Sequence, residues 1–394
     1  MAKANSFLDA RLAHEARAAL ASAKRIVVKI GTATITRQKG QAGRISDGPD
    51  PGGSGIDVEF LHRVAAELAD LARDGRQPVL VTSGAVGMGA RALGLEKKPK
   101  DTASKQACAA IGQPLLMEEY RRAFDVFGLT AAQLLVTREA WEDREAYLNL
   151  RSTVEALLER RAVPVFNEND SVSTAEIAFG DNDRLSAYVA SKIDADLLVI
   201  LSDVDALYDA DPRTDPGARP IPFVREIDPA MMSAAGGKGS EFSTGGMRTK
   251  LMAVAIARDA GCRVALVHGR SPRIISRVIA GEAVGTLFDA DAALRNRQRW
   301  IKRARPKGEI AVDDGALAAM RERRSLLPCG VVSVSGTFER GDVVLIGGAA
   351  MAVTSLSSVE LEAARGKRSS ELGGRDGTGG SRVVARPDDV VFLD

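Results

Sequence analysis

Cysteine, histidine and aromatic residues are all scarce in this chain of 394 residues, which contains 3 cysteines, 3 histidines and 4% aromatic residues. Cys108, Cys262 and Cys329 lie far apart in the sequence and form no CxxC pair. This spacing argues against a disulfide framework and against a zinc site. The three histidines fall on predicted helices or at a strand end, and no Ser/His/Asp triad is apparent. Catalysis by a histidine base is therefore not expected.

Long apolar runs and a strong net charge are also missing. No segment approaches the roughly eighteen uncharged apolar residues that a membrane span requires. The formal net charge of +2 argues against a nucleic-acid binder held by bulk charge. The N-terminal segment, with Arg11, His14, Glu15 and Arg17, has no unbroken apolar core of the kind that a secretory signal needs. These absences predict a cytoplasmic protein that does not associate with a membrane.

The first two thirds of the chain alternate strand-like apolar runs with segments of helical spacing. Strands are expected at residues 25–30, 78–82, 129–136, 162–166, 196–201 and 262–268, and helices at 57–74, 103–124, 145–161, 184–193 and 250–260. Such alternation is typical of crossover units, in which helices cover both faces of a largely parallel sheet. We therefore predict an α/β fold of three layers, an αβα sandwich.

The sequence changes character after Phe288. A basic stretch, residues 296–306, ends at a proline and is followed by one expected short helix at 315–323. Strand-like pieces surround that helix, at 309–312, 330–334, 342–346, 382–385 and 390–393. We predict a large α/β domain over residues 1–290, a basic linker over 291–306 and a small β-rich domain over 307–394.

Acidic and amide side chains gather in two neighbouring stretches, Phe166–Ser171 and Phe179–Arg184. The apolar run Ala162–Phe166 leads directly into the first stretch and is typical of a buried strand. Because open α/β sheets bind ligands at the carboxyl ends of their strands, this cluster is a candidate binding site. Carboxylates and carboxamides together suit a ligand with an ammonium group, or a metal ion. The alternative is a solvated acidic turn that caps helices.

Glycine-rich turns with nearby lysines form a second group of candidates. Thr244-Gly-Gly-Met-Arg-Thr-Lys250 enters a helix expected to start near Lys250, where backbone N–H groups favour an anion. Lys29 lies inside an apolar strand, two residues before Gly31, and a buried lysine needs a partner or a bound anion. The alternatives are a flexible glycine loop for the first stretch and exposure at a sheet edge for Lys29.

A third glycine-rich turn, Val81–Ala90, contains a relaxed dinucleotide fingerprint, Gly87-x-Gly89-x-x-Ala92. We reject the fingerprint because its glycines are expected past the turn, within the next helix. No strand ending in an acidic residue follows about 20 residues later, as the fingerprint requires. The three turns, the two lysines and the acidic cluster together suggest phosphoryl transfer, which mostly needs positioned positive charge and Mg²⁺.

Seven short motifs, in this order, resemble those of the glutamate 5-kinase family within the amino acid kinase superfamily. They are Val28-Lys-Ile-Gly-Thr32, Val81-Thr-Ser-Gly-Ala-Val86, Ser104-Lys-Gln-Ala107, Asn167-Glu-Asn-Asp170, Gly180-Asp-Asn-Asp183, Tyr208-Asp-Ala-Asp-Pro212 and Thr244-Gly-Gly-Met-Arg-Thr-Lys250. Order and spacing fit over residues 25–288, and Gly285–Phe288 closes the domain in the family pattern. Ser325–Val332 and Phe338–Asp342 resemble a PUA domain. The resemblance implies the amino acid kinase fold followed by a PUA-like domain.

The resemblance also implies a role for each candidate residue. Lys29 and Lys250 would bind the transferring phosphoryl group, and Asp183 would hold the two lysines in place. The residues implied to bind glutamate are Ser83, Asn167, Asp170, Asp181 and Asn182. The residues implied to contact ATP are Lys29, Ser202, Asp203, Thr244, Gly245, Gly246, Met247, Arg248, Thr249 and Lys250. No residue is assigned as a protein ligand of a metal.

The reaction implied by the resemblance transfers a phosphoryl group from ATP to the γ-carboxylate of L-glutamate, with Mg²⁺ as cofactor, in the first step of proline biosynthesis. The carboxylate is itself the nucleophile and is ionised at neutral pH, so no general base is needed. The resemblance further implies a homo-oligomer, feedback inhibition by proline, and glutamyl phosphate reductase as a partner.

The chain departs from the family pattern in two places. Ser202 stands where the family usually has threonine, and Ala385-Arg-Pro-Asp-Asp389 replaces a His-Arg-Asp-Asn run. The second departure brings two acids to a surface that would meet phosphates, so nucleic acid is not an expected partner.

Three rival interpretations remain: an N-acetylglutamate kinase, a nucleotide-phosphate kinase and an RNA-binding protein. The acidic cluster disfavours both kinases, because an acetylated substrate has no ammonium group and a nucleotide phosphate would require arginines. The PUA-like domain and the basic residues 295–305 favour the RNA-binding protein, although a charge run is usually a solvated linker.

Overall fold

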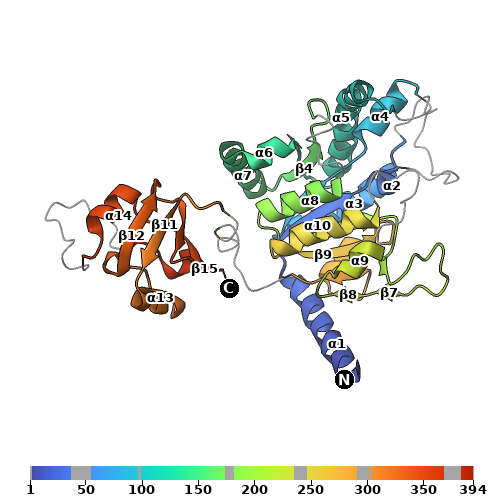
Figure 1. Cartoon of the computed structure of the whole chain (residues 1–394). Helices are drawn as coiled ribbons and strands as arrows, with labels where there is room; N and C mark the ends of the chain where they lie inside the picture. Colours follow the sequence, from blue (N-terminus) through green and yellow to red (C-terminus); the bar gives the residue numbers. More distant parts are fainter. Residues whose placement is uncertain are drawn as a thin grey trace. The chain divides into compact units, whose positions relative to one another are not determined.

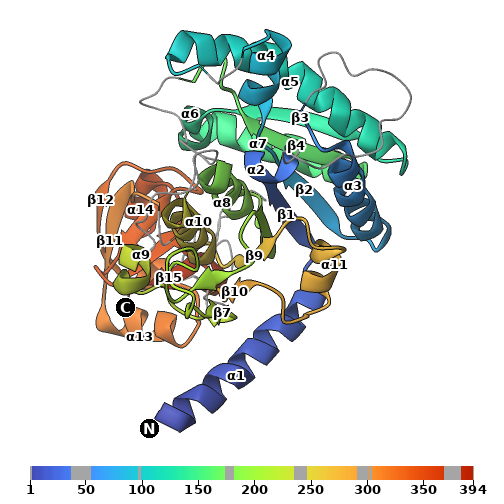
Figure 2. The same ribbon diagram turned by 90° about the vertical axis from the view of Figure 1, so that its right-hand side faces the viewer.

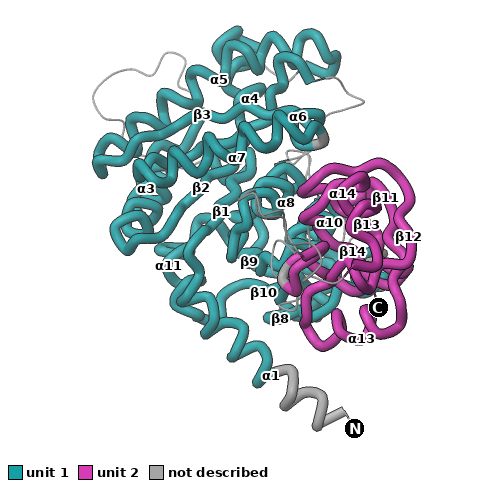
Figure 3. The backbone as a smooth tube through the Cα atoms, turned by 90° about the vertical axis from the view of Figure 1, so that its left-hand side faces the viewer, with its two compact units in different colours: residues 1–291 teal, residues 292–394 magenta. Residues whose placement is uncertain are grey.

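The computed structural model describes residues 2–36, 55–95, 99–173, 182–234, 246–290, 301, 304–367 and 383–393. The chain divides into two compact units, residues 1–291 and residues 292–394 (Figure 3). The predicted linker, 291–306, lies outside the described residues except for Ile301 and residues 304–306.

A sheet that has eight strands within the described residues forms the centre of the first unit, in the order β3-β4-β2-β1-β5-β9-β10-β8. Its strands are β1 (Arg25–Ile30), β2 (Gln77–Val81), β3 (Ala131–Val136), β4 (Val163–Glu168), β5 (Leu197–Ser202), β8 (Phe223–Val224), β9 (Arg263–His268) and β10 (Thr286–Phe288). Neighbouring strands run parallel, except that β9 and β10 are antiparallel. The carboxyl ends of β1, β2, β4, β5 and β9 therefore meet at one edge of the sheet.

Helices cover both faces of this sheet, as Figures 1 and 2 show. One core packs α3 (Val58–Arg73), α5 (Thr102–Asp125) and α11 (Ile274–Ile279) against the sheet, and the other packs α7 (Arg144–Glu159), α8 (Asn182–Lys192) and α10 (Met247–Asp259). Alternation along β1 places Ile26 and Val28 in the first core and Val27 in the second. The predicted α/β fold of three layers is confirmed.

Further helices and a small second sheet complete the first unit within the described residues. They are α1 (Ala2–Ala18), η1 (Ala19–Ser22), α2 (Thr32–Ile35), α4 (Ala85–Ala92), α6 (Arg138–Glu142), α9 (Pro229–Ala234) and a two-stranded sheet of β6 (Leu207–Tyr208) and β7 (Pro220–Ile221). Asp57, Asp101 and Asp143 begin the long helices α3, α5 and α7, because each carboxylate accepts a hydrogen bond from a backbone N–H of the first turn.

Glycines let α4 and α5 approach backbone to backbone. A Cβ atom added at Gly89 would lie 1.8 Å from the carbonyl oxygen of Cys108, and one added at Gly112 would lie 1.8 Å from that of Ala85. Gly87 and Gly89, the glycines of the rejected fingerprint, lie within α4, as expected. Gly89 therefore serves helix packing.

The second unit contains a five-stranded sheet in the order β12-β11-β13-β14-β15, counted over the described residues. Its elements are β11 (Gly308–Val312), α13 (Asp314–Arg321), η2 (Pro328–Gly330), β12 (Val331–Gly336), β13 (Val343–Ile346), β14 (Ala350–Val353), α14 (Ser358–Ala364), η3 (Pro387–Asp389) and β15 (Val390–Phe392). The expected strand at 382–385 is wrong, because in its described part Ala385 forms only an isolated bridge with Leu326. β14 was not predicted, because its alanines and methionine give little β propensity.

None of the helices among the described residues combines the length and the uncharged apolar sequence that a membrane span requires.

Candidate active site

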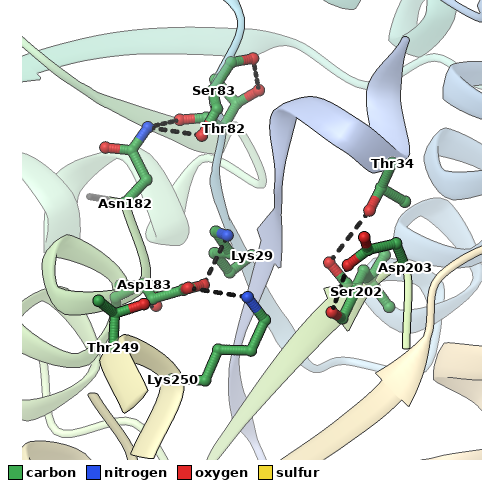
Figure 4. A network of polar contacts seen from close by, with 12 residues as sticks. Lys29, Thr34, Thr82, Ser83, Asn182, Asp183, Ser202, Asp203, Thr249 and Lys250 are labelled. Carbon is green, nitrogen blue, oxygen red and sulfur yellow. Dashed lines mark hydrogen bonds and ion pairs between the residues drawn. The ribbon is translucent and has the colours of Figure 1, made fainter. Parts of the chain in front are cut away.

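The candidate residues gather where the strands of the first unit end. Figure 4 shows Lys29 from β1, Ser83 after β2, Asn182 and Asp183 from the first turn of α8, and Lys250 from the first turn of α10. Because these elements follow or adjoin parallel strands, their side chains meet at the carboxyl edge of the sheet.

Asp183 forms ion pairs with both candidate lysines. Its Oδ1 lies 2.5 Å from Nζ of Lys29, and its Oδ2 lies 3.2 Å from Nζ of Lys250. The three side chains are only 2–10% exposed. Burial opposes the charge of Asp183, but the two lysines outweigh it and lower the pKa of the carboxyl. We call these residues the lysine–aspartate triad; two cations around one anion leave it a net positive charge, which suits an anionic ligand.

The position of Lys29 in the sheet decides between the two interpretations of this residue. β1 lies between β2 and β5, and Lys29 is buried. Exposure at a sheet edge is therefore wrong. A Cβ atom added at Gly31 would lie 3.2 Å from Nζ of Lys29, so this glycine keeps the space beside the ammonium group open.

The glycine-rich stretch before Lys250 is described only from Gly246, so Thr244 and Gly245 lie outside the described residues. Gly246 is the N-cap of α10, which starts at Met247 rather than near Lys250. The hydroxyl of Thr249 donates to the carbonyl of Gly246 (2.8 Å), which stabilises this first turn. Because α10 starts three residues earlier than expected, Lys250 lies within its first turn, and its Nζ points towards Asp183. Arg248 is exposed.

Neutral amides fill the neighbouring part of the site. Nδ2 of Asn182 donates to the carbonyl of Thr82, to Oγ of Ser83 (2.8 Å) and to Oδ1 of Asn167 (2.9 Å). Nδ2 of Asn167 in turn donates to Oε1 of Gln113 (2.8 Å). We call these five residues the amide network. It ties the ends of β2 and β4 to α8.

Asp170 follows β4 and is half-buried. Burial, with a smaller contribution from the charge of Glu168, raises the pKa of Asp170 to about 6. Oε1 of Glu168 accepts a hydrogen bond from Ser173 (3.0 Å). The two carboxylates make this end of the site negative, in contrast to the lysine–aspartate triad. Asp181, the remaining acidic candidate, lies outside the described residues.

Ser202 ends β5, the strand next to β1, and Asp203 follows it. The buried Ser202 hydroxyl donates to Oδ1 of the exposed Asp203 (3.2 Å). In Figure 4, Lys29 lies between this pair and Asn182. The hydroxyl of Thr34, from α2, donates to the carbonyl of Leu201 (3.4 Å) and holds α2 against the end of the same strand.

Three buried polar residues at this edge were not predicted: Thr82, Gln113 and Tyr120. Oη of Tyr120 and Oγ1 of Thr82 lie 2.6 Å apart, and Gln113 holds Asn167. Gln113 and Tyr120 share the buried face of α5 with Ala109 and Leu116. A glutamine at a core position of a predicted helix was therefore the available signal.

No group of three His, Cys, Asp or Glu side chains that could hold a metal ion occurs among the described residues. The carboxylate of Asp183, the most deeply buried acid of the site, is already paired with two lysines. The described side chains therefore do not form a metal cage of their own.

Residues 24–268 match the amino acid kinase family, and residues 308–373 match the PUA domain. The chain belongs to the amino acid kinase family. This finding confirms the resemblance drawn from the motifs.

Several glutamate 5-kinases are similar to the chain over most of its length. The one from Methanosarcina acetivorans is 42% identical over 88% of this chain and 90% of its own. The one from Thermus thermophilus is 43% identical over 89% of this chain and 92% of its own. A solved UMP kinase from Bacillus anthracis has a TM-score of 0.45 and 16% identity, covering 68% of this chain and 97% of its own.

Proposed function

We propose that this chain uses ATP to phosphorylate the γ-carboxylate of L-glutamate, giving L-glutamyl 5-phosphate. The observation that carries the proposal is the meeting of the lysine–aspartate triad and the amide network at adjacent residues, Asp183 and Asn182. The relatives from Methanosarcina acetivorans and Thermus thermophilus, which are glutamate 5-kinases, support it.

The triad would act on the transferring phosphoryl group. Lys29 and Lys250 would place two positive charges against the phosphoryl oxygens, in a buried site where such charges act strongly. Asp183 would keep both ammonium groups in position by its two carboxylate oxygens.

The amide network and Asp170 would hold the acceptor. Ser83, Asn167 and Asn182 would fix its polar groups, and the ionised Asp170, with Asp181, would match its ammonium group. The acceptor carboxylate would attack phosphorus directly. Because that carboxylate is ionised at neutral pH, no side chain has to remove a proton.

The nucleotide would contact Ser202, Asp203 and the glycine-rich stretch Thr244–Lys250, whose described part leads into α10. Mg²⁺ belongs to the proposal as the companion of the nucleotide phosphates, because this ion is usually bound through phosphates and water with one or two carboxylates. The described residues form no group of three His, Cys, Asp or Glu side chains that could hold the ion by themselves, and the proposal gives the ion no chemical step.

Four further parts of the proposal rest on the family resemblance. They are inhibition by proline, assembly into a homo-oligomer, contact with a glutamyl phosphate reductase and a cytoplasmic location. Adding proline to the activity assay and measuring the molar mass of the purified protein by light scattering test the first two.

The test of the proposed function is ADP release by the purified protein with ATP, Mg²⁺ and one acceptor at a time. We expect turnover with L-glutamate and much slower turnover with N-acetylglutamate, aspartate and UMP. A preference for N-acetylglutamate or UMP would contradict the proposal, and so would a lack of glutamate-dependent turnover in folded protein.

A further inference from the structure

The buried face of α5 sends two polar side chains to the ends of two different strands. Tyr120 contacts Thr82 at the end of β2, and Gln113, seven residues earlier, contacts Asn167 in β4. Gln113 is 8% exposed, and its Nε2 is buried. An apolar side chain of similar size would fill this core position without burying polar atoms of its own. A buried amide at such a place therefore needs an explanation.

The explanation lies in the amide group of Asn167, which has a donor end and an acceptor end. Its Oδ1 accepts hydrogen bonds from Asn182 (2.9 Å) and from the backbone N–H of Glu168 (3.0 Å). If the amide turned by half a revolution, Nδ2 would face these two donors. The oxygen of Gln113 opposes that turn, because it accepts from Nδ2 (2.8 Å).

Gln113 makes this contact through its oxygen. Its own Nε2 is buried and has no hydrogen-bond partner among the described residues. Among the described residues, the polar contact of this side chain is therefore its hydrogen bond to Asn167. A buried amide with one unpaired nitrogen costs stability, and such a residue is typical of a site in which a neighbouring group must keep one orientation.

We propose that Gln113 is a positioning residue of the acceptor site, which fixes the amide of Asn167 so that its oxygen faces Asn182. This inference rests on the proposed function for the identity of the acceptor. Gln113 acts through Asn167 and Asn182, not on the reacting atoms. Losing it should therefore loosen the acceptor and leave the nucleotide side unchanged.

The experiment compares Gln113→Met, which keeps the size of the side chain, with Gln113→Glu, which keeps an acceptor oxygen. We expect Gln113→Met to raise the KM for glutamate roughly three- to tenfold, as the loss of one buried hydrogen bond does, with the KM for ATP unchanged. Gln113→Glu should stay within about threefold of the wild type. Gln133→Met, at an exposed glutamine of β3, is the matched control.

An unchanged KM for glutamate in Gln113→Met would overturn the inference, and so would equal changes in both KM values. If that variant does not fold, Gln113→Glu decides the question. A rise of more than threefold in its KM for glutamate, despite the retained acceptor oxygen, would contradict the assignment.

A second measurement, proton exchange at the side-chain amide of Asn182 followed by NMR, needs no turnover. The exchange should be faster in Gln113→Met. If the wild type fails to use glutamate, the proposed function fails, while this exchange rate still tests Gln113.

Discussion

The lysine–aspartate triad and the amide network lie on either side of one peptide bond, between Asn182 and Asp183, but they are built from different groups. The triad consists of two buried cations that pair with the same carboxylate, so its geometry depends on that single carboxylate. The amide network is neutral and depends on the direction of each hydrogen bond. Charge can hold an anion that changes shape during reaction, whereas directed amides can select one acceptor.

The largest expected effect comes from the triad. Lys250→Ala should lower turnover by about 10²–10³, because one of the two cations proposed to face the phosphoryl oxygens is lost. The measurement is ADP release at saturating glutamate and ATP. Lys24→Ala, at an exposed lysine of the same unit, is the control. Near-normal turnover by well-folded Lys250→Ala would remove this lysine from the site.

The next effect tests Asp170, which together with the amide network forms the proposed acceptor side of the site. Asp170→Ala should raise the KM for glutamate roughly ten- to a hundredfold and leave the KM for ATP nearly unchanged, because the proposed charge-assisted hydrogen bond to the ammonium group is lost. Asp74→Ala, at an exposed carboxylate after α3, should behave as the wild type. Loss of ATP affinity with a normal glutamate KM would reverse the assignment of the two halves.

The stability of the folded protein should also depend on pH through Asp170, on the proposed acceptor side of the site. The pKa of Asp170 is raised to about 6, so its ionisation in the folded protein is unfavourable. This cost is absent below the ordinary aspartate pKa, grows as the pH rises towards 6 and is constant above it. Asp170→Asn should therefore raise the melting temperature at pH 8 but not at pH 4. If Asp170→Asn and the wild type had equal melting temperatures at pH 8 as well as at pH 4, the carboxylate of Asp170 would be well solvated.

The smallest effect should follow removal of the second unit. Both halves of the site belong to residues 1–291, so a chain that ends near Gln298 should keep its turnover and both KM values. An inactive or insoluble truncation would show that the two units fold together. Salt-dependent RNA binding by the isolated second unit is the companion measurement, and tight binding would restore the RNA-binding alternative.

The sequence predicted the layers and the charged half better than the amide half. Apolar runs such as Leu197–Leu201 reveal central strands, and a lysine inside such a run, as at Lys29, must have a partner. The family resemblance of the motifs assigned Asp183 as the partner of this lysine. The register between α5 and β4 is a tertiary property, so the pairing of Gln113 with Asn167 could not be predicted from either segment alone. The exact start of α10 was missed because residues 247–249 were assigned to the glycine-rich turn, although Met247 and Arg248 are good helix formers.

The proposed roles are separate: the triad acts on the phosphoryl group, and the acceptor side binds glutamate. The most direct test of this separation is one steady-state experiment, in which glutamate and ATP are varied together for the wild type, Lys250→Ala and Asp170→Ala. The account predicts that Lys250→Ala loses mainly kcat, while Asp170→Ala changes mainly the KM for glutamate. If both variants lowered kcat and raised both KM values to the same extent, the triad and the acceptor side would not be separable, and the account would be contradicted.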